Sequence, residues 1–249
     1  MADAGRAPPA SDTAELTAIA SPLRAAALYL IATLPGEELD AASLDRLRAA
    51  AAGGVDAVQL RMKHARTDQR RAALLAARSA LPDAVRLLIN DDVDALFDAR
   101  GAALADGVHL GRDDAAALAP AGGNEAERRA AGLRAARERL GPALALGSST
   151  REPWEVELAH AAGADHLGFG AIALSTSKTD SAPASLDALH ELARARPALP
   201  LFPIGGLTPT TLAELARRGI RRAAVGAAIF AARDPEVAAR ACRAALGLT

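Results

Sequence analysis

Short apolar runs alternate with longer amphipathic segments along most of the chain. The runs have the length of buried strands, and we predict strands over 25–33, 55–61, 85–90, 107–111, 143–147, 165–170, 199–204 and 222–225. The segments between them show helical spacing, and we predict helices over 41–52, 68–81, 94–104, 125–140, 185–196 and 235–246, with two more inside 148–163 and 205–219. Eight strands alternating with eight helices predict one α/β domain, a (β/α)₈ TIM barrel.

A doubly wound open sheet is the alternative architecture. It fits less well because no G-x-G-x-x-G turn follows the first predicted strand. Pro203 lies inside the seventh predicted strand, where a proline removes one ladder hydrogen bond. We keep that strand because Gly205, Gly206 and a helix start at Thr208 and Pro209 follow it.

The N-terminal segment and one long connection stand outside the regular alternation. Residues 1–24 are rich in alanine, proline and serine, so we expect a flexible extension with at most one helical turn near 14–19. The barrel then covers 25–249. After the fourth predicted strand, a stretch with Pro120 and a pair of glycines predicts a surface insertion near 115–130.

Composition narrows the class of protein further. With 51% hydrophobic but only 2% aromatic residues, the chain favours alanine-rich helices around short strands over an all-β fold. A formal net charge of −1 gives no electrostatic footprint for nucleic acid or an anionic membrane. Cys242 is the only cysteine, which excludes a disulfide framework, and we expect it, like His109, to pack in the interior. Without a signal core or an apolar run near the roughly 20 residues that span a bilayer, we expect a cytoplasmic protein.

Polar side chains gather where the third and fourth predicted strands end. The third strand ends in Asn90, Asp91 and Asp92, and the fourth is followed by Asp113 and Asp114. Because the carboxyl ends of neighbouring parallel strands lie side by side, oxygens from both could share one hard cation such as Mg²⁺. Asp is also a favoured helix N-cap, so these carboxylates could instead begin the helices that follow.

Lysine is almost absent from the chain. Of 29 lysine and arginine residues only Lys63 and Lys178 are lysines. A position that keeps lysine against such a bias is expected to need a compact ammonium group rather than a planar guanidinium. Alternation along the second strand places Lys63 on the same side as Gln59 and Arg61.

Small residues follow the seventh and eighth predicted strands, at 205–206 and at 226–228. In (β/α)₈ barrels these two loops often present backbone N–H groups to a phosphate, and glycine lets the anion approach closely. Close packing of strand against helix is the structural alternative. A rim of cations and carboxylates beside such a phosphate site suits a diphosphate bound with a divalent metal.

Seven short motifs at the predicted strand ends carry a family likeness. They are QLRMK (59–63), INDD (89–92), GVHLGRDD (107–114), LGSST (146–150), GFGAIALSTSK (168–178), PIGGLTP (203–209) and VGAAIF (225–230). Over about residues 26–246 the chain resembles thiamine-phosphate synthase. The resemblance implies a Mg²⁺-dependent transferase that joins a hydroxymethylpyrimidine diphosphate to a thiazole phosphate and releases diphosphate by a dissociative route. It leaves open whether the thiazole carries a carboxylate and whether the chain forms a homo-oligomer.

The resemblance also implies roles for individual residues. Asp91 and Asp114 would ligate Mg²⁺. The side chains that would hold the pyrimidine diphosphate are Gln59, Arg61, Lys63, Asn90, Ser149 and Lys178. Those with a catalytic part among them would be Arg61, Lys63, Ser149 and Lys178. The residues that would face the thiazole phosphate are Ser175, Thr176, Ser177, Gly206, Gly226 and Ala227.

The chain departs from the family pattern at four positions. Met62 replaces a usual glutamate, and as a neighbour of Arg61 its side chain is expected to point away from the polar face of the strand. Ala173 and Leu174 replace an aromatic residue and a proline ahead of the Ser/Thr loop, which affects the closed shape of that loop. Ala227 replaces a serine and so loses a hydroxyl but keeps the backbone donors.

Two other functions compete with the synthase. The related thiazole tautomerase barrel usually has a histidine where this chain has Ala171, and it lacks the paired carboxylates. A non-catalytic paralogue that binds a thiamine phosphate would explain the changes at 173, 174 and 227. Intact Asp91, Asp114, Lys63 and Lys178 favour the synthase over both.

Overall fold

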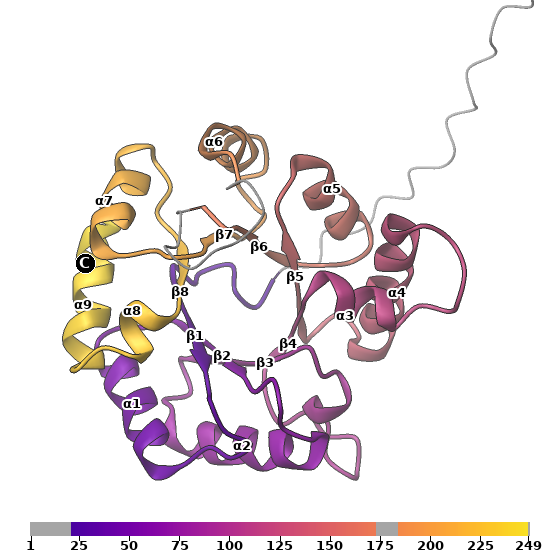
Figure 1. The fold of residues 1–249 in the computed structure, drawn as a ribbon, viewed down its shortest axis with the longest axis horizontal. Helices are drawn as coiled ribbons and strands as arrows, with labels where there is room; N and C mark the ends of the chain where they lie inside the picture. The colour runs from indigo at the N-terminus through magenta and orange to yellow at the C-terminus, as the bar shows by residue number, and fades with distance from the viewer. Residues whose placement is uncertain (1–20, 173–183, 249) are drawn as a thin grey trace, which may run out of the picture.

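Eight parallel strands close the barrel, each pairing with the next in chain order and β8 returning to β1 (Figure 1). The structure is a computed structural model that describes residues 21–172 and 184–248. The strands are β1 (Leu28–Thr33), β2 (Ala57–Arg61), β3 (Arg86–Asn90), β4 (Gly107–Leu110), β5 (Ala145–Thr150), β6 (His166–Gly170), β7 (Leu201–Ile204) and β8 (Ala223–Val225). The predicted (β/α)₈ architecture is confirmed.

Helices form a ring around the barrel and alternate with its strands (Figure 1). The longer helices are α1 (Ala41–Ala52), α2 (Thr67–Ala80), α4 (Glu125–Leu140), α5 (Pro153–Ala161), α6 (Leu186–Ala195), α7 (Pro209–Arg217) and α9 (Pro235–Ala245). Shorter turns are η1 (Asp94–Leu96), α3 (Arg112–Ala117) and α8 (Ala227–Phe230). Each helix within the described ranges is too short or too polar to cross a membrane.

The helices begin where the sequence supplies caps. Ahead of α1, the Asp40 carboxylate accepts the Ser43 N–H at 2.8 Å. Asn124 and Glu127 form a reciprocal capping box at the start of α4. Prolines occupy the first turn of α5, α7 and α9, where a missing N–H removes no helical hydrogen bond. These local signals explain why the predicted and observed limits of α1, α4 and α9 agree closely.

Alternate side chains of each strand face opposite sides of the barrel wall. In β1, Leu28 and Leu30 pack in the outer cluster beneath the helices, whereas Tyr29 and Ile31 belong to a smaller interior cluster. The other members of the interior cluster are Leu23, Ala26, Ala57, Leu88, Ala145, Phe202 and Ala224. The barrel interior is therefore a packed core, and a cavity opens at one end of it.

Part of the predicted N-terminal extension packs into the barrel. Residues 1–20, including the turn expected near 14–19, lie outside the described residues. Ser21 and Leu23 are buried: Leu23 packs in the interior cluster, and the Ser21 hydroxyl donates to Asp165 at 2.9 Å. The prediction was wrong for 21–24 because it followed the average composition of the whole segment. One leucine in that segment, Leu23, fills the N-terminal end of the barrel.

The helix predicted over 94–104 is wrong beyond its first turn. Only η1 is helical, and Phe97 then pairs with Ala103 in an isolated antiparallel bridge. The Asp98 carboxylate accepts the N–H groups of Arg100 and Ala102 at 2.8 Å each, with Gly101 at φ +81° between them. Such side-chain bonds favour a turn over a helix, and they outweigh the weak periodicity of the segment.

The segment near 115–130 is buried at its two ends and mostly exposed between them. Ala115 and Ala116 of α3 are buried, and α4 packs closely against them. A Cβ on Gly132 of α4 would lie 1.8 Å from the Ala115 carbonyl oxygen, so the contact needs glycine. Arg129, near the start of the helix predicted to be polar, is only 1% exposed. The polarity of the sequence did not reveal that this arginine is paired in the interior with Glu155.

Seven of the eight strands begin one to three residues later than predicted, and β5 also ends later. β7 keeps Pro203, which pairs in register with Phe169 of β6, while β7 meets β8 through one pair, Ile204 and Ala224. β5 runs to Thr150, three residues beyond its predicted end, because β6 continues beside it up to the pairing of Thr150 with Phe169. Serine and threonine at the end of β5 therefore stand on the strand itself.

Candidate active site

The larger cavity opens at the carboxyl ends of the strands and measures about 830 Å³. It brings together most of the residues predicted to bind substrate: Gln59, Arg61, Asn90, Ser149, Gly206, Gly226 and Ala227 all line it. Sequence reasoning missed the rest of its wall, formed mainly by Tyr29, Ile31, Thr33, His109, Phe202 and Thr208. Alternation along the first strand could have placed Tyr29, Ile31 and Thr33 on the interior side.

A smaller cavity of about 450 Å³ adjoins the first one. Its lining includes Lys63, Asn90, Asp91 and Asp114, which join charged groups of both signs at one rim. Asn90 belongs to the lining of both cavities, so the two spaces meet at its side chain. Lys63 therefore lies with the carboxylates rather than beside Gln59, although Gln59 stands in β2 and Lys63 follows the strand closely.

Several predicted site residues fall outside the described residues. They are Ser175, Thr176, Ser177 and Lys178, together with the departures Ala173 and Leu174. The other two departures are described: Met62 is 1% exposed and packs in the outer cluster, as expected for a residue next to Arg61. Ala227 begins α8 and lines the larger cavity.

Asp91 and Asp114 converge over Gly111. The point that a Cβ on Gly111 would occupy lies 2.6 Å from one oxygen of Asp114 and 3.3 Å from one oxygen of Asp91. Asp91 has φ +66°, a left-handed conformation, and its carboxylate accepts the Gly111 N–H at 2.8 Å. The Asn90 amide also donates to Asp91. The chain thus folds both carboxylates toward one small volume.

The pKa of Asp91 reflects this crowding. Burial raises it above its ordinary value, and the nearby carboxylate of Asp114 raises it further, against the opposing effects of the Gly111 N–H and Arg61. A divalent cation between the two oxygens would relieve that repulsion, and carboxylates are the ligands that Mg²⁺ prefers. The donor set of Asp91 and Asp114 therefore fits Mg²⁺, with water and substrate oxygens needed to complete its octahedron.

Asp92 has the capping role that Asp91 lacks. Its carboxylate accepts the Ala95 N–H at 2.9 Å and the Thr67 hydroxyl at 2.9 Å, and it pairs with Arg70 at 2.8 Å. Burial acts to raise its pKa, but these hydrogen bonds lower the pKa overall. The metal-ligand interpretation therefore fits Asp91, whereas the helix-cap interpretation fits its neighbour Asp92.

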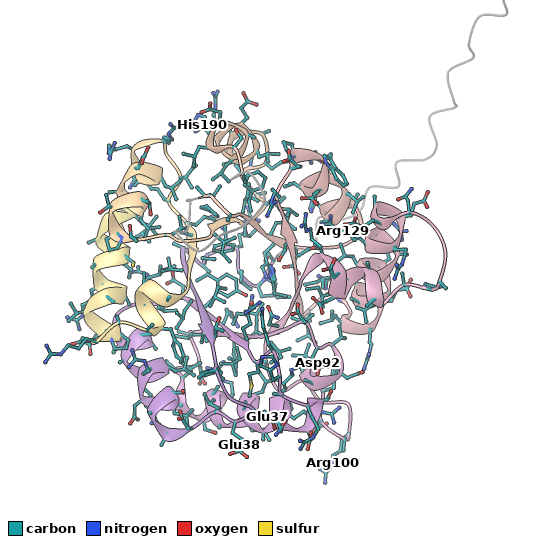
Figure 2. The ribbon with its side chains drawn as sticks, in the orientation of Figure 1. Glu37, Glu38, Asp92, Arg100, Arg129 and His190 are labelled. Atoms are coloured by element: carbon teal, nitrogen blue, oxygen red, sulfur yellow. The ribbon has the colours of Figure 1, made fainter. Side chains whose placement is uncertain are left out.

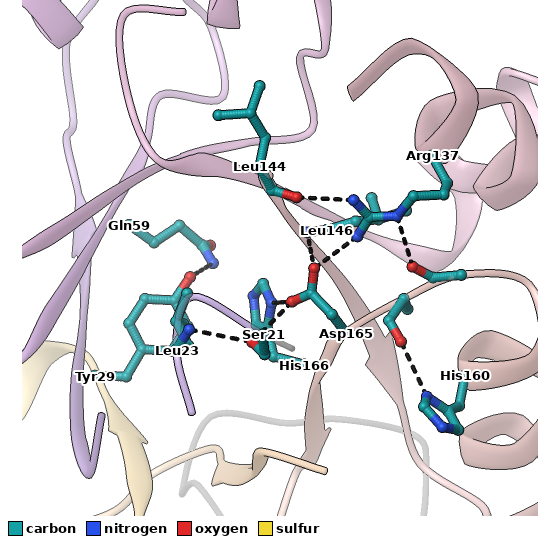
Figure 3. A network of polar contacts seen from close by, with 12 residues as sticks. Ser21, Leu23, Tyr29, Gln59, Arg137, Leu144, Leu146, His160, Asp165 and His166 are labelled. Carbon is teal, nitrogen blue, oxygen red and sulfur yellow. Dashed lines mark hydrogen bonds and ion pairs between the residues drawn. The ribbon is translucent and has the colours of Figure 1, made fainter. Parts of the chain in front are cut away.

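Polar groups form the inner wall of the larger cavity. The Gln59 amide donates to the Tyr29 hydroxyl at 2.8 Å, which leaves its carbonyl oxygen for a ligand (Figure 3). His109 lies 3.1 Å from the Ser149 hydroxyl, measured from Nε2. His109 is buried as predicted, yet it also lines the cavity and touches a predicted site residue.

The opposite wall is built from backbone rather than side chains. Gly205 and Gly206 follow β7 with φ +106° and φ +62°, values that favour glycine. Gly226 and Ala227 lead from β8 into α8, whose first N–H groups have no partner within a helix. At these four positions the wall offers backbone donors without a large side chain, which suits a phosphate group.

Fold and site together define a (β/α)₈ barrel enzyme that acts on phosphorylated small molecules. The thiamine monophosphate synthase family model matches residues 28–229. The chain belongs to the thiamine-phosphate synthase family, whose members are transferases of thiamine biosynthesis.

Individual relatives agree with this assignment. The chain is 41% identical over 204 residues to a thiamine-phosphate synthase of Anaeromyxobacter dehalogenans, covering 80% of each chain. It is 38% identical over 215 residues to that of Bordetella pertussis, covering 82% of this chain and 88% of the relative. The structure of a thiamine phosphate pyrophosphorylase from Pyrococcus furiosus superposes with a TM-score of 0.70 at 26% identity, covering 90% of this chain and 96% of that one.

Proposed function

We propose that the chain joins 4-amino-2-methyl-5-hydroxymethylpyrimidine diphosphate to 4-methyl-5-(2-phosphoethyl)thiazole and releases diphosphate. One observation carries the proposal: a cavity with carboxylates and a lysine meets a cavity with a glycine-lined wall at Asn90. The first suits a metal-bound diphosphate and the second an aromatic ring beside a phosphate. Holding both substrates across this junction would convert a bimolecular step into a unimolecular one.

Cationic side chains supply the first part of the mechanism. Arg61 lines the larger cavity and Lys63 the smaller one, so both face the junction from β2 and its C-terminal turn. Their charges stabilise the negative charge that develops on diphosphate as the carbon–oxygen bond breaks. Mg²⁺ held by Asp91 and Asp114 would supply further charge neutralisation to the same leaving group.

The second part of the mechanism is the placement of the nucleophile. Backbone donors around Gly206, Gly226 and Ala227 hold the thiazole phosphate and so direct the thiazole nitrogen toward the junction. Gln59 and Ser149 bind the pyrimidine ring from the opposite wall. We assign Ser175, Thr176 and Ser177 to binding of the thiazole phosphate and Lys178 to binding of the diphosphate, as the family resemblance implies.

The test is turnover by the purified chain with both substrates. We expect thiamine phosphate and diphosphate in equal amounts, with activity lost in a chelator and restored by Mg²⁺. Asp114→Asn should lower kcat/KM by at least about a hundredfold because a metal ligand is lost. Asp113→Asn is the matched control, since Asp113 is an exposed neighbour in the same turn of α3.

Other outcomes separate the competing functions. Binding of both substrates without product would identify a non-catalytic paralogue. Isomerisation of a thiazole phosphate alone would identify a tautomerase, a function opposed by Ala171, which carries no proton-transferring group. Either result would overturn the synthase proposal.

A further inference from the structure

Two buried histidines face one another beneath the larger cavity. Strand register places His109 of β4, Gly147 of β5 and His166 of β6 in one row across the barrel wall. The two imidazole rings have centroids 5.5 Å apart. The point that a Cβ on Gly147 would occupy lies 2.3 Å from His109 Nδ1 and 2.2 Å from His166 Nε2. Only glycine at 147 leaves room for these nitrogens to approach each other.

One end of this row is anchored by an ionised carboxylate. Asp165 is buried and accepts His166 Nδ1 at 2.9 Å, the Ser21 hydroxyl at 2.9 Å and the Leu146 N–H at 2.8 Å (Figure 3). Arg137 pairs with it at 2.6 Å and balances its charge. A carboxylate can only accept, so His166 carries a proton on Nδ1, and in the neutral form of the ring Nε2 holds a lone pair.

The other end of the row reaches the cavity at Ser149, whose hydroxyl lies 3.1 Å from His109 Nε2. Between the ends, His109 Nδ1 and His166 Nε2 are both buried without a partner in the described part of the chain. A buried polar nitrogen left unpaired costs about 1–3 kcal/mol, so the lone pair on His166 requires a donor. His109 Nδ1 lies close to the same point above Gly147 and is therefore a candidate donor, although the two nitrogens form no hydrogen bond in the structure.

We propose that His166, oriented by Asp165, is a positioning residue that fixes the proton of His109 on Nδ1 and thereby the direction of the Ser149 hydroxyl. With its Nδ1–H donated to His166, neutral His109 accepts at Nε2, so the Ser149 hydroxyl donates to it. The Ser149 oxygen then offers only lone pairs to the cavity. A ligand must meet it with a hydrogen-bond donor, such as an amino group, and a carbonyl there is rejected.

The ligand named in this inference rests on the proposed function, whereas the geometry of His109, His166 and Ser149 does not. The direct test is the ¹⁵N chemical shift of the imidazole nitrogens in the full-length protein at neutral pH. We expect His109 and His166 both to be neutral and protonated at Nδ1. A proton on Nε2 of His109, or two protons on either ring, would overturn the proposal whatever the enzyme does.

A variant series tests the consequence for ligand choice. His166→Phe keeps a ring but removes the acceptor, whereas His166→Gln keeps an acceptor for His109 and a donor for Asp165. The probes are the aminopyrimidine diphosphate and its analogue with an oxo group in place of the amino group, read by dissociation constants. We expect the preference of the native protein for the amino compound to fall about tenfold or more in the Phe variant and to return in the Gln variant.

Controls keep the outcomes distinct. His190→Phe changes a histidine on the outer ring of helices (Figure 2) and should leave the preference unchanged. Should the Phe variant not fold, the Gln variant and the ¹⁵N shifts still decide. Equal preference in native and folded Phe proteins overturns the positioning role. Binding of neither pyrimidine by the native protein would instead sink the proposed function, while the ¹⁵N shifts would still report on the histidines.

Discussion

Asp91 has a left-handed backbone conformation and a carboxylate that repels that of Asp114. Two substitutions separate the effects of these properties. Asparagine tolerates φ +66° and its amide oxygen can still accept the Gly111 N–H, but it carries no charge. In a chelator, Asp91→Asn should therefore melt at the same temperature as the native chain or higher. Asp91→Ala should melt lower, because alanine is strained at this φ.

The same variant should lose its response to the metal. Adding Mg²⁺ with diphosphate should raise the melting temperature of the native chain and leave that of Asp91→Asn unchanged, as followed by scanning calorimetry. Asp92→Asn is the contrasting variant: it loses part of the pairing with Arg70 and melts lower, yet it keeps the metal response. A full metal response in Asp91→Asn would remove Asp91 from the metal site.

His109 gives the molecule a dependence of stability on pH. Burial, and to a lesser extent the neighbouring His166, lower the pKa of His109 to about 3, against about 6.5 in an unfolded chain. Between these values the unfolded state binds one more proton than the folded state, so stability falls as the pH falls. The slope is up to about 1.4 kcal/mol per pH unit.

The measurement is a set of urea unfolding curves between about pH 4.5 and 6.5, above the range in which ordinary carboxyl groups titrate. His109→Gln should flatten the dependence in that window whatever its effect on absolute stability. An unchanged slope would show that His109 is protonated in the folded protein. Below about pH 4 a second loss is expected, since the pKa of Asp165 is also lowered and its stabilising contribution disappears on protonation.

At the scale of elements, α4 depends on a buried ion pair. Arg129 of α4 (Figure 2) donates to Glu155 of α5 at 2.5 Å and to the Ser149 carbonyl at 3.2 Å. Both Arg129 and Glu155 are nearly inaccessible to solvent. The Glu155 carboxylate also accepts the N–H of Glu152 at 3.0 Å at the start of α5. One arginine thus connects α4, α5 and the end of β5.

Arg129→Met should lower the free energy of unfolding by about 3–5 kcal/mol, because Glu155 would be left buried with only the partly exposed Arg112, at 3.4 Å, as a counter-charge. Arg134→Met is the matched control on the exposed face of the same helix, and it should change stability by less than about 0.5 kcal/mol. Urea denaturation of the three proteins is the measurement. Equal stability of both variants would show that the pair contributes nothing.

The same element shows where sequence reasoning stops. Strand and helix order could be predicted because period-two and helical patterns are local, and the caps at Asp40 and Asn124 set helix limits. The burial of Arg129 could not, because it depends on Glu155, which reaches it only when α4 and α5 pack together.

Some features of the candidate site could likewise be predicted from the sequence, and others could not. Asp91, Asp114, Lys63 and the glycine loops stand at strand ends and could be found in the sequence. The row through Gly147 could not, because it requires the register of three strands.

At the scale of the molecule, the chain before β1 closes the end of the barrel opposite the cavity. Leu23 is fully buried among interior side chains, and Ser21 bonds to the Asp165 that anchors His166. Leu23→Ala should therefore cost about 2–5 kcal/mol, the usual range for removing a buried leucine side chain. The neighbouring Arg24→Ala, at an exposed side chain, should change stability little.

Thermal unfolding of both variants checks this prediction, with the native chain as reference. Loss of stability in Leu23→Ala alone would place residues 21–24 within the barrel domain. Similar melting temperatures for Leu23→Ala and Arg24→Ala would instead make that segment an appendage.

The scarcity of lysine has a practical consequence for this barrel. Besides the N-terminus, only Lys63 and Lys178 carry a primary amine, and Lys63 is exposed beside the paired carboxylates. An acylating reagent applied to the intact protein therefore has very few targets, and mass spectrometry can assign each one. Slower acylation of Lys63 when diphosphate and Mg²⁺ are present would report occupancy of the smaller cavity without any need for turnover. A reagent that acylates most proteins at many positions would, on this chain, report whether the rim of the smaller cavity is occupied.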